Sequence, residues 1–101
     1  MPVFMVVEVT DVVDPEMYAE YQRRVPATVE KYGGRYVVRG GDVVPLTGNW
    51  KPARMIVLEF PSMERMTAWN FSDDYLELAP LCIRSTKTRA IALHSFVAGE
   101  P

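Results

Sequence analysis

Two glutamates interrupt strongly apolar segments of this sequence. Glu8 follows the apolar residues 3–7, and Glu59 follows the apolar residues 55–58. Burying a carboxylate is costly unless an arginine pairs with it or it takes up a proton. A paired glutamate would stabilise the fold, whereas one with a raised pKa could move a proton to or from a bound molecule. Glu59 is therefore the first candidate for a catalytic residue.

Two arginines flank a short β-branched segment between glycine pairs. Arg35 and Arg39 are four residues apart, so the two-residue repeat of a strand predicts that both lie on one face. If this strand runs antiparallel beside the one that carries Glu59, one arginine can reach the carboxylate. A structural ion pair is the commoner outcome of such a pairing. In the functional alternative, an arginine such as Arg39 orients an anionic or carbonyl group while Glu59 transfers a proton.

His94 is a third candidate catalytic residue. It lies near the end of the chain beside the small residues Ala90 and Ala92, which could leave a hollow next to it. A single strand histidine is more often a packing residue than a general base, and both alternatives stand.

Aromatic side chains could line an apolar ligand pocket, although a helical aromatic stripe usually belongs to the core. The candidates are Tyr18, Tyr21, Trp50, Trp69 and Tyr75. Trp50 stands out because it lies in a loop rich in proline and glycine. A loop tryptophan normally needs a partner subunit or a ligand to pack against.

Metal and cofactor sites are not predicted. The sequence has one histidine and one cysteine, whereas zinc and facial-triad sites draw on several such ligands. The glycine pairs lack the spacing of a dinucleotide or phosphate-binding loop. Cys82 has apolar helical neighbours, so we expect it in the core rather than as a nucleophile.

Composition limits the remaining classes of function. With 101 residues, 49% of them hydrophobic and 24% charged, the chain has the size and balance of one globular domain, expected over residues 1–98 with a tail at 99–101. The net charge of −2 argues against nucleic acid as a partner. No apolar run is long enough for a membrane span, and a single cysteine fits a cytoplasmic location.

The order of predicted elements is β-α-β-β-α-β. We expect strands at 3–10, 35–39, 54–60 and 89–97. A first helix is expected from Pro15 to the Gly33-Gly34 stop, with a kink at Pro26. Further helical pieces are expected at 63–69 and 75–87, the last kinked at Pro80. Asp14 is the expected N-cap of the first helix, and Ser62 that of the second. This order is that of the ferredoxin-like α+β fold.

The fold predicts an antiparallel four-stranded sheet with strand order 2-3-1-4 and helices on one face. Within it we expect strands one and three to be parallel neighbours, which would bring Glu8 and Glu59 together. The other face carries apolar residues, expected to be Phe4, Val6, Val37, Ala90, Ala92 and Phe96. An uncovered apolar face of this extent predicts a homodimer in which two sheets pack together.

Three parts of the chain together carry a resemblance to a known family: the run Tyr32 to Gly41, the segment Glu59-Phe60-Pro61-Ser62, and Trp69 with Ser72-Asp73-Asp74-Tyr75 and Arg84. These segments resemble the bacterial "domain of unknown function 1330" family. The resemblance covers nearly the whole chain and implies a dimeric α+β barrel. It also implies a candidate ligand site formed by Arg35, Arg39, Glu59, Tyr75 and Arg84.

This resemblance does not select a reaction, because the superfamily includes cofactor-independent monooxygenases, isomerases, haem enzymes and structural or stress-linked proteins. Our first hypothesis is a homodimer that binds a small anionic or oxygenated organic molecule between sheet and helices, with cofactor-independent acid/base chemistry. The alternatives are a non-catalytic structural or stress-linked module and, more weakly, a haem- or metal-dependent monooxygenase.

Overall fold

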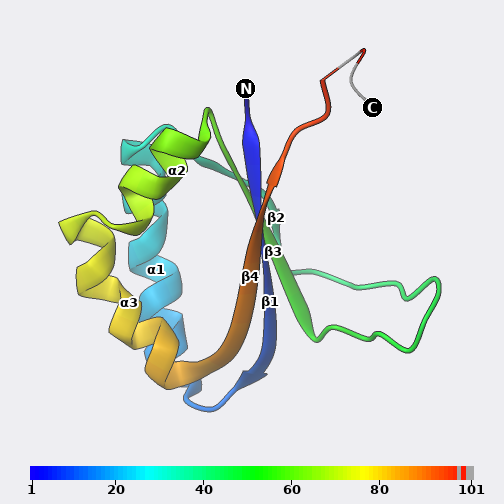
Figure 1. The fold of residues 1–101 in the computed structure, drawn as a ribbon. Helices are drawn as coiled ribbons and strands as arrows, with labels where there is room; N and C mark the ends of the chain where they lie inside the picture. Colours follow the sequence, from blue (N-terminus) through cyan, green and yellow to red (C-terminus); the bar gives the residue numbers. More distant parts are fainter. Residues whose placement is uncertain (98, 100–101) are drawn as a thin grey trace.

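A computed structural model describes residues 1–97 and 99 of the chain, and it shows one antiparallel sheet covered on one face by helices (Figure 1). The elements are β1 (Val3–Val12), α1 (Pro15–Lys31), β2 (Arg35–Arg39), β3 (Arg54–Phe60), α2 (Met63–Asn70), α3 (Asp73–Ser85) and β4 (Thr86–His94). The sheet order is β2-β3-β1-β4. The predicted ferredoxin-like α+β fold is therefore confirmed.

The first helix begins and ends where the sequence predicts. Asp14 is its N-cap and accepts a hydrogen bond from the Met17 backbone N–H, with Pro15 at the first helical position. The helix ends before Gly33, whose φ of 80° lies in the left-handed region that favours glycine. Pro26 lies inside α1 and does not end it.

Two serines begin the helices of the second half. The Ser62 hydroxyl accepts from the Arg65 N–H at the start of α2, and the Ser72 hydroxyl accepts from the Tyr75 N–H at the start of α3. Pro80 lies within α3, and the helix continues to Ser85. The chain then passes directly into β4, which begins at Thr86 and ends at His94 rather than spanning the predicted 89–97.

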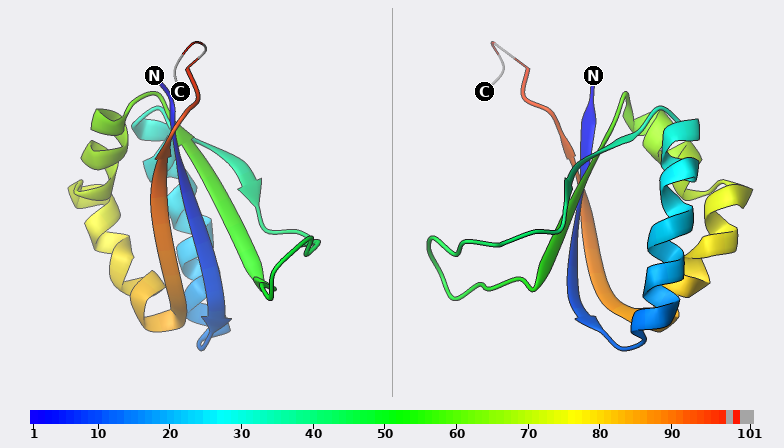
Figure 2. Two further views of the ribbon diagram at one scale, coloured as in Figure 1. Left: turned by 45° about the vertical axis from the view of Figure 1, so that its right-hand side comes forward. Right: turned by 180° about the vertical axis from the view of Figure 1, so that it is seen from behind.

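The hydrophobic core lies between the helices and the facing side of the sheet. Its buried members are Val3, Val25, Val29, Leu58, Phe60, Trp69 and Leu78. The ring of Trp69 packs 5.3 Å from that of Phe60, and its indole N–H donates to the Thr28 hydroxyl at 3.0 Å. This core holds α1, α2 and α3 on one face and leaves the other face of the sheet, here called the open face, without helices (Figure 2).

The predicted parallel pairing of the two central strands is wrong. β1 and β3 are antiparallel: the chain returns through α1 so that β2 runs in the same direction as β1, and the connection from β2 to β3 then reverses it. Glu8 therefore lies opposite Met55, and Glu59 lies opposite Phe4, at the far end of the pair. The two carboxylates are not neighbours.

A β-bulge in β2 overturns the prediction that Arg35 and Arg39 share a face. Tyr36 lies opposite Leu58 and Val38 lies opposite Val57, so Val37 is an extra residue in the ladder. Each residue after the bulge is shifted by one position relative to the alternation of side chains. Arg35, paired with Glu59, lies on the open face, whereas Arg39, which donates to the Gln22 carbonyl oxygen of α1, lies on the helix-facing side.

The register of β4 also differs from the prediction for the open face. Ala90 and Ala92 lie opposite Val7 and Met5, which face the helices, so they belong to the helix-facing side. The apolar residues that β4 places on the open face are Ile91 and Leu93, which are 59% and 47% exposed. Phe96 lies beyond the end of β4.

Residues 40–53 form an irregular segment between β2 and β3, here called the arm. The arm projects from the sheet on the side away from the helices (Figures 1 and 2). Val43 and Val44 do not extend β2. The predicted tail at 99–101 lies largely outside the described residues. No helix among the described residues has the length and apolar character needed to cross a membrane.

Candidate functional site

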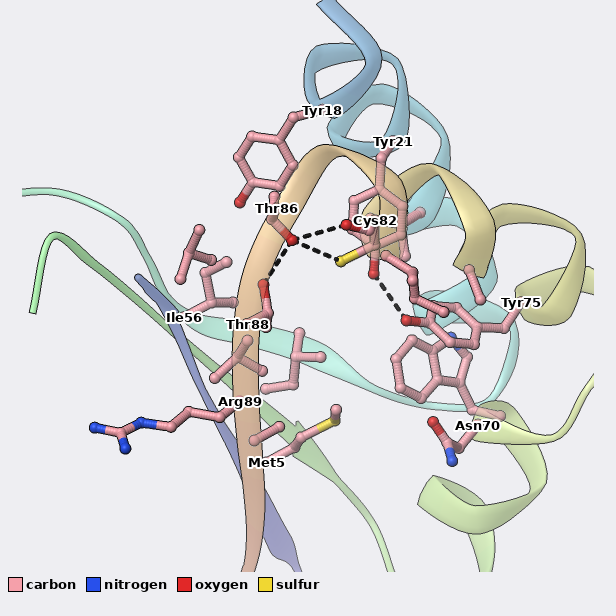
Figure 3. A pocket seen from close by; sticks show the side chains of 18 of the residues that line it. Met5, Tyr18, Tyr21, Ile56, Asn70, Tyr75, Cys82, Thr86, Thr88 and Arg89 are labelled. Atoms are coloured by element: carbon pink, nitrogen blue, oxygen red, sulfur yellow. Dashed lines mark hydrogen bonds between the residues drawn. The ribbon is translucent and has the colours of Figure 1, made fainter. Parts of the chain in front are cut away.

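A cavity of about 660 Å³ lies between the helix-facing side of the sheet and the helices. Its walls are mainly aliphatic and aromatic, with Met5, Val7 and Ile56 from the sheet (Figure 3). This volume lies within the range of about 300–1,000 Å³ found for small-molecule sites. Four of the five aromatic candidates from the sequence line it, and they are Tyr18, Tyr21, Trp69 and Tyr75.

Two tyrosine hydroxyls meet on the helix side of the cavity. The Tyr21 and Tyr75 oxygens, from α1 and α3, are 3.0 Å apart and share a hydrogen bond (Figure 3). Burial raises the pKa of both phenols, and the neighbouring Tyr75 raises that of Tyr21 further. Both groups therefore stay protonated at neutral pH. One hydroxyl donates within the pair, so the proton of the other remains free for a ligand.

A chain of hydroxyls lies at the junction of α3 and β4. Thr86 donates to the Cys82 carbonyl oxygen at 2.8 Å, and the Thr86 and Thr88 hydroxyl oxygens are 2.7 Å apart. Because the single Thr86 proton is engaged, Thr88 is the donor in the second bond. Cys82 is half-buried and lines the cavity, so it is not the sealed core residue that its neighbours predict.

Exposed apolar residues form the rim where the cavity meets solvent. Phe71, Leu76 and Ile83 are exposed apolar residues that also line the cavity. Arg89 contributes to the lining, but its guanidinium points away from the helices (Figure 3). The entrance therefore favours the passage of an apolar molecule.

The predicted pairing of an arginine with Glu59 is present and lies on the open face. The Arg35 guanidinium nitrogen is 2.7 Å from the Glu59 carboxylate oxygen. The Arg35 side chain is 67% exposed and that of Glu59 is 24% exposed, so the pair is in contact with water. Neither residue lines the cavity.

Glu8 forms a second polar cluster on the open face, with Arg89 and Trp50. Arg89 Nε is 2.6 Å from one Glu8 oxygen, and the indole N–H of Trp50 donates to the other at 3.1 Å. Hydrogen bonds first from Arg89 and then from Trp50 lower the pKa of Glu8. The carboxylate is thus held ionised, and it fastens the arm to the sheet.

The other predicted site residues lie apart from the cavity. His94 is exposed at the end of β4, Arg84 is exposed in the last turn of α3, and neither lines the cavity. Arg39 lies beside the cavity, stacked on the ring of Tyr36. The catalytic roles assigned to Glu59, Arg39 and His94 stay predictions.

Among residues 1–97 and 99, no group of three or more metal-binding side chains comes together.

Some residues of the site were not singled out from the sequence. Tyr36, Thr86 and Thr88 line the cavity, and Arg54 lies next to it under Tyr18. The two-residue repeat of β3 places Arg54 on the face of the buried Leu58, which is a signal that the sequence contains. The contacts of Thr86 depend on the α3–β4 junction, which no local pattern locates.

The family model "Domain of unknown function (DUF1330)" matches residues 2–96. This chain belongs to that family. The family match confirms the resemblance that the sequence segments indicated. None of the curated proteins compared with the chain matches it.

Solved structures of similar fold include proteins of unknown function and an oxygenase. A protein of unknown function from Rhodopseudomonas palustris is 22% identical, with a TM-score of 0.74 over 95% of this chain and 83% of that one. A dimeric ferredoxin-like protein of unknown function from Jannaschia sp. CCS1 is 8% identical, with a TM-score of 0.71 over 94% and 100%. SnoaB, a cofactor-independent oxygenase from Streptomyces nogalater, is 14% identical, with a TM-score of 0.65 over 98% of each chain. At these identities the likeness shows a shared fold.

Proposed function

We propose that this protein binds a small, oxygen-bearing organic molecule in the cavity between sheet and helices. The observation that carries the proposal is the Tyr21–Tyr75 hydroxyl pair inside a mainly apolar cavity. An apolar wall favours the carbon skeleton of a ligand, and a few placed hydroxyls select and orient its oxygen atoms. The apolar rim at Phe71, Leu76 and Ile83 supports entry of such a molecule from this side.

The second candidate is cofactor-independent chemistry on the bound molecule. The relation in fold to SnoaB, which is named as a cofactor-independent oxygenase, favours this candidate. In it, the protonated Tyr21–Tyr75 pair donates a hydrogen bond to a ligand oxygen. It does not act as a base, because burial raises both pKa values.

We also propose that the protein forms a homodimer through the open face. Ile91, Leu93 and Val38 leave apolar surface exposed there, beside the half-buried Phe4 and Val6. Contiguous apolar surface of this kind is typical of interaction sites. The structural neighbour from Jannaschia is named as dimeric, which agrees with this arrangement.

A cavity-filling variant tests ligand binding directly. Ala79 of α3 lines the cavity, so Ala79→Leu should occupy part of its volume and weaken binding. Ala68 of α2 is exposed and does not line it, which makes Ala68→Leu the matched control. A thermal-shift screen against carboxylates, phenols and lactones would first identify a ligand that raises the melting temperature.

The expected result is a stabilising compound whose effect is lost in Ala79→Leu and kept in Ala68→Leu. Tyr75→Phe should then weaken binding of oxygenated compounds, because a buried donor to the ligand is removed. Equal shifts in both alanine variants would place the ligand elsewhere. A screen without any stabilising compound would favour the structural module.

A further inference from the structure

Two arginines that lack acidic partners lie just outside the cavity, next to two tyrosines that line it. Arg39 ends β2 opposite Ile56, and Arg54 begins β3 two residues earlier on the same face. They are diagonal neighbours on the helix-facing side of the sheet. Within residues 1–97 and 99, neither guanidinium forms an ion pair with a carboxylate.

Two tyrosines connect these arginines to the cavity. The Arg39 guanidinium carbon lies 4.7 Å from the ring centre of Tyr36, and that of Arg54 lies 6.0 Å from the ring centre of Tyr18. Both tyrosines line the cavity. Burial raises the pKa of Tyr36, and the charges of Arg39 and Arg54 oppose this rise, so both guanidinium groups act on the same phenol.

Two hydrogen-bond donors in this group of arginines and tyrosines have no acceptor among the described residues. The Tyr18 hydroxyl and Arg54 Nε are both buried and unpaired, and the Tyr18 side chain is only 6% exposed. Figure 3 shows the Tyr18 hydroxyl directed toward the sheet. An arginine can only donate, so a bound acceptor is required to satisfy it. Buried polar groups without partners are uncommon and indicate a missing water or ligand atom.

We propose that the ligand carries an oxyanion head group, of which a carboxylate is the simplest, and that Arg54 and Tyr18 bind it. Arg39 adds positive charge, and its bond to the Gln22 carbonyl oxygen holds it in place. A guanidinium matches the planar geometry of a carboxylate, and the charge strengthens each hydrogen bond. The apolar body of the ligand lies along the wall formed by Tyr21, Tyr75 and Trp69. This inference rests on the proposed function and names the charged part of its ligand.

Two probes of the same shape and different charge test this site. Isothermal titration calorimetry at pH 7 would compare 2-naphthoate with the neutral 2-acetylnaphthalene. The wild type should bind the carboxylate more tightly. Arg54→Gln should weaken 2-naphthoate about tenfold or more, the size expected for one charge-assisted hydrogen bond, and leave 2-acetylnaphthalene nearly unchanged. Tyr18→Phe should weaken 2-naphthoate by a smaller factor.

A matched control, two replacement variants and a check of folding complete the experiment. Arg65→Gln removes the same charge from an exposed site on α2 and should change neither affinity. Arg39→Gln and Tyr18→Phe replace Arg54→Gln if that variant fails to fold, because the Arg54 guanidinium packs closely against Gly40. Circular dichroism confirms that each variant is folded.

Equal affinity of the wild type for both probes would overturn the oxyanion site while leaving the cavity as a binding site. The same conclusion follows if the Arg54, Arg39 and Tyr18 variants weaken both probes alike. If neither probe binds the wild type and no compound of the screen does, the proposed function itself fails.

Discussion

Glu8 shows how a single carboxylate can be buried in a sheet at neutral pH. It is 8% exposed, and each of its oxygens accepts a hydrogen bond, one from Arg89 and one from Trp50. These bonds lower its pKa below the ordinary value of 4.5. Glu8 therefore stabilises the folded state at pH values above 4.5. This contribution is lost as the pH falls through the lowered pKa of the folded state.

We predict that the free energy of unfolding of Glu8→Gln depends less on pH in the acid range than that of the wild type. Urea unfolding followed by circular dichroism from pH 6 to about pH 3 would measure this for wild type and variant. The wild type should be more stable at pH 6, and the difference should shrink on acidification. A constant difference across the range would contradict the role given to Glu8.

Glu59 is expected to behave differently, because its own side chain is more exposed than that of Glu8 and accepts a hydrogen bond from Arg35 alone among the described residues. An exposed ion pair such as Arg35–Glu59 contributes about 0.2–1 kcal/mol, so Glu59→Gln should lower the free energy of unfolding by no more than this. Ligand affinity in the cavity should not change, since Glu59 lies on the open face. If affinity or turnover fell in the folded variant, the catalytic role predicted from the sequence would be supported instead.

At the scale of the elements, the two serine caps make a matched pair. Ser72 is buried, and its hydroxyl also donates to the Trp69 carbonyl oxygen at 2.7 Å, whereas the cap at Ser62 is more accessible. Ser72→Ala should cost about 1–2 kcal/mol of unfolding free energy, and Ser62→Ala about 0.5–1 kcal/mol. Chemical denaturation measures both, and a larger loss at Ser62 would contradict this ranking.

The elements were predictable from the sequence to a greater extent than the faces of the strands. Caps, glycines and β-branched runs are local signals, and they located α1, β2 and β3 closely. The bulge at Val37 has no such signal, and one extra residue reverses the face of every residue after it. The sequence therefore predicts the strand that contains Arg39 correctly but assigns the Arg39 side chain to the wrong face of the sheet.

The candidate site was predictable only in part for the same reason. Tyr21, Trp69 and Tyr75 share the cavity because helical spacing fixes which side they present. The combination of Glu59 with Arg39 assumes a regular alternation of side chains along β2, which the bulge at Val37 interrupts. Their separation depends on strand pairing between distant segments, which a single sequence does not specify.

At the scale of the whole molecule, the proposed homodimer depends on the open face. Ile91→Glu places a charge in the centre of the proposed interface and should convert the protein to a monomer of 11.5 kDa. Ile83→Glu alters an isoleucine on the helix side that is also exposed, 75% against 59% for Ile91, and should leave the dimer intact. Light scattering coupled to size-exclusion chromatography measures the mass. A monomeric wild type, or loss of the dimer only in Ile83→Glu, would contradict association through this face.

The two tryptophans lie on opposite sides of the sheet. Trp69 is 1% exposed beside the cavity, whereas Trp50 is 54% exposed on the arm above the open face. The emission of an indole depends on its immediate surroundings, so the protein contains one intrinsic fluorescent reporter for each face. Single-tryptophan variants would therefore separate ligand entry from subunit association in one optical experiment, without any added label.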